Sequence, residues 1–344
     1  MLDDPIAAPL RPPPPGFTLR RPGWADLRAV AELFATCSLD RIGQVTVRPG
    51  DLEVRWLELS GFDDALLVER PDADPPLVAY ADVQVDRDPW SDDLDVHVEG
   101  RVHPDWTGQG LAGFLLGRAE ARALRAAQRA ELDGVVLRTT VVDGDDAARA
   151  FFAGRGFTPV RHLLELRLDL HAPPPAPVWP EAVRCRTFAP GRDEELAWRT
   201  HQAAFADVPT HLALDLEEWL EDRVRRDPAF DPRLTFLATT GEGDDEEVVG
   251  LAVCREGVEG VVEDGWIRDL GVLPAWRRRG IGIALLRTAF AAFRERGLTG
   301  VALEVDDVTV EGAVALYRRA GMRIVRRTDV VEKVLRLDDG PGLS

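Results

Sequence analysis

The chain has 344 residues, the length of two ordinary domains that each bury a hydrophobic core. Apolar residues make up 45% and charged residues 30%, a balance typical of a folded soluble protein, which excludes disordered, fibrous and membrane-spanning classes. The formal charge of −18 would repel nucleic acids and anionic membranes, so we expect neither as a partner.

In chain order, the first feature is a Pro-rich stretch, residues 1–16, which we expect to be a loose tail. It lacks the basic segment followed by an apolar segment that directs secretion, so we expect a cytoplasmic protein. The three cysteines are scattered singly, and the histidines show no metal-ligand spacing. This pattern argues against a disulfide framework and against a metal site.

Two parts of the chain repeat one another. Val102–Leu116 aligns without a gap on Val272–Leu286, and the two segments share Val, Pro, Trp, Gly and a Leu-Leu pair. Shorter matches flank this one in the same order: Leu77–Val83 with Val248–Cys254, and Phe151–Phe157 with Leu316–Met322. Three matches in one order predict a duplicated domain.

The joint between the copies is a Pro-rich stretch, residues 171–181, which continues neither a helix nor a sheet and is typical of a spacer. We therefore predict separately folded domains over residues 17–170 and 182–337. Residues 338–344 are expected to form a second loose tail.

The periodicity of the second copy predicts a mixed α/β domain. Helices are expected over residues 194–205, 214–226, 281–296 and 310–319. Strands are expected over residues 233–240, 248–254, 266–272 and 301–305, with one or two closing strands over 323–337. Gly297 and Gly321 each follow a predicted helix, where glycine suits a left-handed cap.

The most informative segment is the loop at residues 277–282, between the strand that ends at Val272 and the following helix. The first N–H groups of a helix have no internal partner, so they bind phosphate where glycine allows a close approach. Gly280 and Gly282 provide that approach, and three adjacent arginines provide guanidinium groups. The alternative is a solvated loop before an amphipathic helix. The loop fits neither a P-loop nor a dinucleotide-binding fingerprint.

The pattern Arg277-x-x-Gly280-x-Gly282, together with the repeat, resembles the GNAT acyltransferase superfamily over nearly the whole chain. More narrowly, the tandem arrangement is similar to the mycothiol synthase group. The resemblance implies an α/β fold with two tandem GNAT-like domains, each a mixed, mostly antiparallel sheet flanked by helices. It also implies acetyl-CoA, or another acyl-CoA, as cosubstrate.

The resemblance implies where an acyl-CoA would bind. The pyrophosphate would lie on the amides of Arg277, Arg278, Arg279, Gly280, Ile281, Gly282 and Ile283. The pantetheine arm would follow the strand Leu270, Gly271 and Val272, whose last N–H groups would polarise the thioester carbonyl.

Tyr317 stands where similar proteins have the tyrosine that protonates the leaving thiolate. A phenol within hydrogen-bond reach is a plausible acid for this step, because its pKa of about 10 keeps it protonated at rest. The alternative is a tyrosine ring that only packs on the core.

The base that takes the amine's proton is less well marked. Similar enzymes have a glutamate at the strand position that Trp266 fills here. The nearest carboxylates are Asp269 in the same strand, and Glu263 and Asp264 just before it. For each of them, a solvated surface position is the alternative.

The first copy departs further from the family pattern. Thr107 replaces the loop arginine, and Phe152 replaces Tyr317. A phenyl ring donates no proton, so we expect at most a weaker second binding site, formed by Gly108, Gln109, Gly110 and Ala112.

The sequence therefore predicts an N-acyltransferase, most simply an N-acetyltransferase, whose C-terminal domain transfers the acyl group directly to a small-molecule primary amine. We expect no metal, and a monomer or homodimer. Two alternatives remain open: a non-catalytic acyl-CoA-binding module, and an enzyme that acetylates protein N-termini or lysines.

Overall fold

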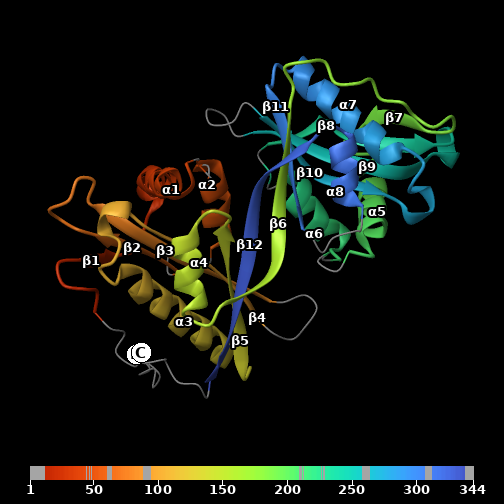
Figure 1. The fold of residues 1–344 in the computed structure, drawn as a ribbon. Helices are drawn as coiled ribbons and strands as arrows, with labels where there is room; N and C mark the ends of the chain where they lie inside the picture. The colour runs from red at the N-terminus through yellow and green to blue at the C-terminus, as the bar shows by residue number, and fades with distance from the viewer. Residues whose placement is uncertain are drawn as a thin grey trace. The chain divides into compact units, whose positions relative to one another are not determined.

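A computed structural model describes residues 12–337 except 44, 46, 48, 60–63, 88–93, 209, 210, 212, 226, 228, 258–263 and 307–311. The chain divides into two compact units (Figure 1). The N-terminal unit is Met1–Val160 with Thr328–Ser344, and the C-terminal unit is Arg161–Arg327. None of the described helices is long and apolar enough to cross a membrane.

In the N-terminal unit, a sheet in the order β1-β2-β3-β4-β5-β12 is antiparallel except where β4 pairs with β5. Helices α1 and α2 pack on one face, and α3 and α4 on the other. The strands are β1 Thr18–Arg20, β2 Ala65–Glu69, β3 Leu77–Arg87, β4 Leu94–Val102, β5 Gly134–Val142 and β12 Arg323–Arg336. The helices are α1 Leu27–Ile42, α2 Pro49–Glu58, α3 Leu111–Arg129 and α4 Asp146–Ala153.

The C-terminal unit repeats this plan with the order β6-β11-β10-β9-β8-β7, in which only β10 and β11 run parallel. Helices α5 and α6 pack on one face, and α7 and α8 on the other. The strands are β6 Thr158–Asp169, β7 Arg184–Thr187, β8 Phe230–Thr240, β9 Glu247–Glu256, β10 Asp264–Val272 and β11 Gly300–Asp306. The helices are α5 Glu194–Phe205, α6 Leu216–Leu220, α7 Ile281–Glu295 and α8 Ala313–Arg319.

Each sheet is covered on both faces because its strands alternate inward and outward side chains. In β3, Tyr80 packs with α1 and α2, whereas its neighbours Ala79 and Ala81 pack in the cluster that includes α3. The mixed, mostly antiparallel α/β fold with two similar units is therefore confirmed.

Most predicted elements of the second copy lie within a few residues of their predicted bounds. Gly297 follows α7 with a φ of +82°, the left-handed conformation expected of it. The helix predicted over 214–226 begins later, at Leu216, because Asp215 caps it and forms a capping box with Glu218. It then continues as a π-helical turn, Glu221–Arg225.

The unit boundaries differ from the predicted domains 17–170 and 182–337 because the closing strands are exchanged. Thr328–Arg336 of β12 pairs with β5 in the N-terminal unit. Leu163–Asp169 of β6 pairs with β11 in the C-terminal unit. The last strand of each copy in the sequence therefore completes the sheet of the other unit.

Candidate active site

The loop before α7 has an unusual backbone. A 3-10 turn, Pro274–Trp276, follows β10, and α7 begins at Ile281 with Gly280 as its N-cap at a φ of +92°. Arg278 also has a positive φ of +64°, which is uncommon for a residue with a side chain. The loop leads into the unpaired N–H groups of the first turn of α7, as a phosphate-binding loop requires.

Arg277 holds this loop in place. Its Nε donates to the Val272 carbonyl at 3.1 Å and its Nη2 to the Ala204 carbonyl at 2.9 Å. Both terminal nitrogens also bond the Asp207 carboxylate, one of them at 2.8 Å. The guanidinium therefore fastens the loop to the end of β10 and to α5. The geometry favours a positioning role for Arg277 and leaves the exposed Arg278 and Arg279 as the loop's free cations.

After its first three residues, β10 pairs with a neighbouring strand along one of its two edges only. It pairs with β9 as far as Val272, but with β11 only from Asp264 to Trp266. Among the described residues, the edge of Leu270–Val272 that faces β11 therefore has no strand partner. That edge is where the sequence predicts the pantetheine arm. A bulge between Ile267 and Asp269 changes which side chains of the strand point to each face of the sheet.

Gly271 allows α5 to pack closely on β10. A Cβ on Gly271 would lie 2.9 Å from Ala204 Cβ and 2.9 Å from Phe205 Cε2. Asp269, two residues earlier on the same face of the strand, is directed toward α5 as well. The bulge and the glycine together bring the Asp269 carboxylate against the helix.

Asp269 lies between two cationic or protonatable side chains. The His201 Nε2 of α5 is 3.4 Å from its Oδ1, and the Arg223 Nε is 3.0 Å from its Oδ2. Burial alone would raise the pKa of Asp269, but the His201 ring and the charge of Arg223 outweigh it. They hold this pKa well below its usual range. Asp269 is therefore an ionised carboxylate and, by itself, a weak base.

Buried polar atoms without a hydrogen-bond partner among the described residues gather around Asp269. They are His201 Nδ1, Gln202 Nε2 and Trp219 Nε1, while His201 Nε2, Arg223 Nε and Asp269 Oδ2 also lack a hydrogen bond but belong to the ion pairs of Asp269. Leaving a buried polar group unsatisfied costs about 1–3 kcal/mol, so such a concentration is typical of a functional site rather than of a packed core.

Tyr317 lies on the other side of β10, in the core that α7 and α8 cover. Only 9% of the side chain is exposed. Burial, and then the charge of Asp269, raise the pKa of Tyr317 to about 12. The Tyr317 side chain therefore packs with α7 and α8, whereas Asp269 contacts His201 of α5 and Arg223.

Asp264 is not brought to this site. It begins β10, about 15 Å of extended strand before Asp269. Arg167 bonds both of its oxygens, one of them at 2.9 Å. Glu263 lies outside the described residues. Among the described residues, no group of three or more His, Cys, Asp or Glu side chains is placed to hold a metal ion.

Sequence reasoning missed His201 and Arg223. The signal for His201 was present, because Ala197, Thr200, His201 and Ala204 form the buried face of α5. A histidine on that face needs a polar partner, which Asp269 provides. Arg223 gives no such signal, because it lies among other charged residues.

The N-terminal unit has a loop with the same backbone conformation but without the arginines and the tyrosine. Gly108 and Gly110 have φ values of +73° and +83°, matching the left-handed residues Arg278 and Gly280. The predicted second site at Gly108, Gln109, Gly110 and Ala112 therefore has the same turn before its helix. Phe152, at the position of Tyr317, packs edge-on against Phe151 and Phe157.

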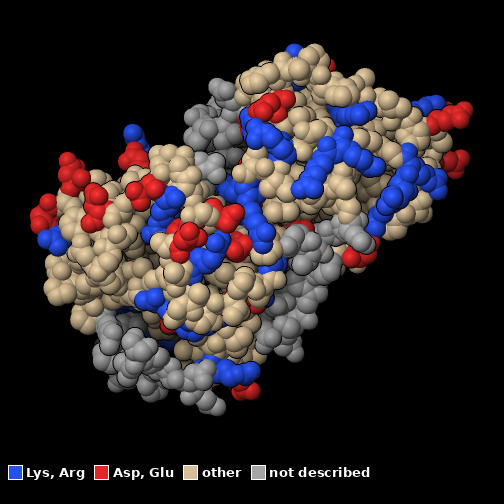
Figure 2. All heavy atoms as spheres, in the orientation of Figure 1, with Lys and Arg blue, Asp and Glu red and all other residues tan. Residues whose placement is uncertain are grey.

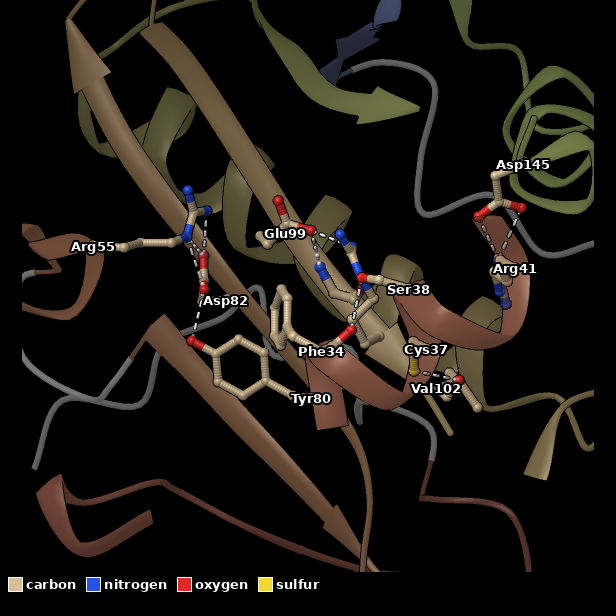
Figure 3. A network of polar contacts seen from close by, with 12 residues as sticks. Phe34, Cys37, Ser38, Arg41, Arg55, Tyr80, Asp82, Glu99, Val102 and Asp145 are labelled. Atoms are coloured by element: carbon tan, nitrogen blue, oxygen red, sulfur yellow. Dashed lines mark hydrogen bonds and ion pairs between the residues drawn. The ribbon is translucent and has the colours of Figure 1, made fainter. Parts of the chain in front are cut away.

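The face of the N-terminal sheet that α1 and α2 cover carries a polar network of a different kind (Figure 3). Arg55 Nε donates to both oxygens of Asp82, at 2.8 and 2.9 Å, and the Tyr80 hydroxyl donates to the same carboxylate at 2.6 Å. Glu99, aligned with Asp269, is bonded by Arg101, which is aligned with Gly271. These carboxylates are bonded by arginine and tyrosine side chains, whereas Asp269 pairs with His201 and Arg223.

Comparison with known proteins identifies the family of the chain. Residues 194–322 match the Acetyltransferase (GNAT) family. The mycothiol acetyltransferase of Thermobispora bispora is 36% identical over 225 residues, which cover 64% of this chain and 70% of that protein. The mycothiol acetyltransferase of Streptomyces griseus is 32% identical over 325 residues, which cover 93% and 94%.

Solved structures show the same tandem fold. A GCN5-related N-acetyltransferase from Sphaerobacter thermophilus has a TM-score of 0.78 at 32% identity, covering 94% of this chain and 97% of that one. A tandem GNAT protein from the clavulanic acid biosynthesis pathway has a TM-score of 0.64 at 15% identity, covering 95% and 99%. The duplicated α/β plan, the loop before α7 and these sequence relatives lead to one conclusion: the chain belongs to the GNAT acetyltransferase family.

Proposed function

We propose that the C-terminal unit transfers an acetyl group from acetyl-CoA to the primary amine of a small molecule, without a covalent enzyme intermediate. The observation that carries this proposal is the unpaired edge of Leu270–Val272, which leads into the loop of residues 277–283 before α7. The relatives named mycothiol acetyltransferase support a small-molecule acceptor.

On the donor side, the amides of residues 277–283 bind the pyrophosphate. The free edge of Leu270–Val272 binds the pantetheine arm, and its last N–H groups polarise the thioester carbonyl. Arg277 contributes by fixing the loop to Asp207 and to the backbone, rather than by contacting phosphate.

In the transfer, the amine nitrogen attacks the carbonyl carbon and the C–S bond breaks, so the electron pair leaves with sulfur. Tyr317 donates its hydroxyl proton to the departing thiolate. Its raised pKa, about 12, keeps the phenol protonated at neutral pH, so the donor is in place in every cycle.

The amine's own proton goes to the pair formed by Asp269 and His201. An ionised carboxylate with a depressed pKa is a weak base, whereas an imidazole is a common general base. His201 therefore takes the proton, and Asp269, 3.4 Å away, stabilises the imidazolium. This pair replaces the strand glutamate that is absent at Trp266.

The N-terminal loop is proposed as a weaker second acyl-CoA site without turnover. Its backbone repeats the turn of the C-terminal loop, but Thr107, Gly108 and Gln109 supply no cation. Phe152 supplies no acid.

The test is a thermal-shift screen with acyl-CoAs, followed by a free-thiol assay over a panel of small amines. Binding stabilises the native state, so acetyl-CoA is expected to raise the Tm. Thiol release with small amines supports the proposal. Release only with peptides would favour protein acetylation, and stabilisation without any turnover would favour a non-catalytic binding module.

A further inference from the structure

The acidic chain contains two acid-free segments that are rich in arginine. Residues 273–294 and 312–327 hold ten arginines and no aspartate or glutamate, although the chain has 60 acidic residues and a net charge of −18. These two segments form the loop before α7, nearly all of α7, all of α8 and the start of β12. We refer to the exposed residues Arg278, Arg279, Arg294, Arg318 and Arg319 on these segments as the arginine face.

Most arginines of these two segments differ from the others in the C-terminal unit. Fifteen described arginines of the unit form ion pairs with carboxylates. Six have no carboxylate partner among the described residues: Arg278, Arg279, Arg287, Arg294, Arg318 and Arg319. Figure 2 shows basic side chains gathered over α7 and α8.

Packing brings part of the arginine face to the phosphate loop. A Cβ on Gly282, in the first turn of α7, would lie 3.2 Å from Leu316 Cδ2 of α8. Arg319 follows Leu316 by three residues, so it lies on the same side of α8, one turn further on. On the loop itself, the Arg279 guanidinium lies 4.8 Å from the centroid of the Trp276 ring. Cations therefore flank the loop from both elements.

The proposed pyrophosphate site already has hydrogen-bond donors in the loop amides. The positive charge beside the loop is therefore more than a pyrophosphate requires. CoA carries one more phosphate, a monoester on its ribose, with a charge of about −1.5 to −2 near neutral pH. The overall negative charge of the protein would repel such a polyanion, so binding needs a local positive field. Exposed, unpaired guanidinium groups beside the loop supply this field and the matching hydrogen-bond donors.

We propose that the arginine face binds the ribose 3′-phosphate of CoA, with Arg319 as the principal ligand, so that the C-terminal unit selects free acyl-CoA. This inference rests on the proposed function, since it concerns the same cosubstrate. The N-terminal unit gives an internal contrast. Its segment corresponding to residues 273–294, residues 103–124, contains Asp105 and Glu120, and Thr107, Gly108 and Gln109 replace the three loop arginines.

The experiment is calorimetric titration of the full chain with CoA and with dephospho-CoA, which lacks only the 3′-phosphate. The wild type is expected to bind CoA about tenfold to a hundredfold more tightly. Arg319→Gln should lower the affinity for CoA toward that for dephospho-CoA, and leave the affinity for dephospho-CoA unchanged. Arg319 is exposed, so the variant should fold, which its Tm verifies.

Arg294→Gln is the matched control. It also removes one positive charge from the arginine face, but at a position about 18 Å along α7 from Gly282. This variant should keep the wild-type preference for CoA. Equal affinities of the wild type for the two ligands would overturn the inference, as would an Arg319→Gln variant that loses both equally. If neither ligand binds, the proposed function itself fails. Thiol release at similar rates from an acyl group on an acidic carrier protein would assign the face to a protein partner instead.

Discussion

At the scale of single residues, Tyr317 is a phenol enclosed by the core, and its pKa is raised chiefly by burial. Replacing it by phenylalanine keeps the ring and removes only the hydroxyl. We expect Tyr317→Phe to fold, to bind acetyl-CoA normally, and to lose about 10² to 10⁴ in kcat, the usual value of general-acid assistance. Steady-state thiol release gives kcat and KM for both proteins.

Phe152→Tyr is the reciprocal control, and we expect no gain in activity because the N-terminal loop also lacks cations. A Tyr317→Phe variant with the wild-type kcat would show that Tyr317 is not the general acid.

Asp269 also contributes to stability. Its pKa is depressed in the folded protein, so its ionised form stabilises the fold above the pKa of the unfolded carboxyl, about 3.9. As pH falls below about 4 toward the folded-state pKa, that contribution is lost. Asp269→Asn leaves Arg223 partly buried without its partner, and removing one partner of a buried pair costs about 3–5 kcal/mol.

The difference in the free energy of unfolding between wild type and Asp269→Asn should therefore be large at pH 7 and shrink progressively below pH 4. Urea unfolding followed at several pH values measures it. A difference that does not change between pH 7 and pH 3 would contradict the ionised pair. His171→Gln, at an exposed histidine outside the site, should show no difference at any pH.

At the scale of elements, the loop before α7 depends on its tie to α5. If Arg277 contacted phosphate directly, Asp207→Ala would release the guanidinium and strengthen CoA binding. The structure leads to the opposite expectation, because Asp207 and Arg277 together hold the loop. We expect Asp207→Ala and Arg277→Thr each to weaken CoA binding several-fold, and the double variant to lose little more than either single one.

Calorimetry on the four proteins gives the coupling between the two residues. If the losses in binding free energy are additive, or if Asp207→Ala binds CoA more tightly, Arg277 contacts the phosphate directly.

Elements whose pattern is local could be predicted from the sequence, and those that depend on distant partners could not. The spacing of apolar residues gives α5 its bounds, and Gly297 marks the end of α7. The bulge before Asp269 has no local signal, because it follows from how β10 meets β9. The loop motif could likewise be predicted, but the partners of Arg277 and Asp269 come from α5 and the turn after α6, far away in the sequence.

At the scale of the whole molecule, the exchanged strands couple the two ends of the chain. Nine residues of β12, Thr328–Arg336, pair with β5, and Val330, Val331 and Leu335 are buried there. Deleting residues 328–344 should expose the edge of β5 and destabilise the N-terminal unit more than the C-terminal unit, which contains none of them.

Hydrogen exchange resolved by peptide locates this effect. We expect protection to fall in β4 and β5 and to persist in β9 and β10. Deleting residues 338–344 alone is the control and should leave both units protected. Equal loss of protection in both units, or none in either, would contradict the assignment of the closing strand.

The exchange also has a consequence for biosynthesis. A domain at the start of a chain ordinarily folds while the ribosome is still making the remainder. Here the N-terminal unit lacks its sixth strand until Thr328–Arg336 has left the ribosome. Until that strand has been made, the edge of β5 stays unpaired. An unpaired strand edge invites association with other chains. The unit that is made first is thus the one with the longest need of protection by chaperones.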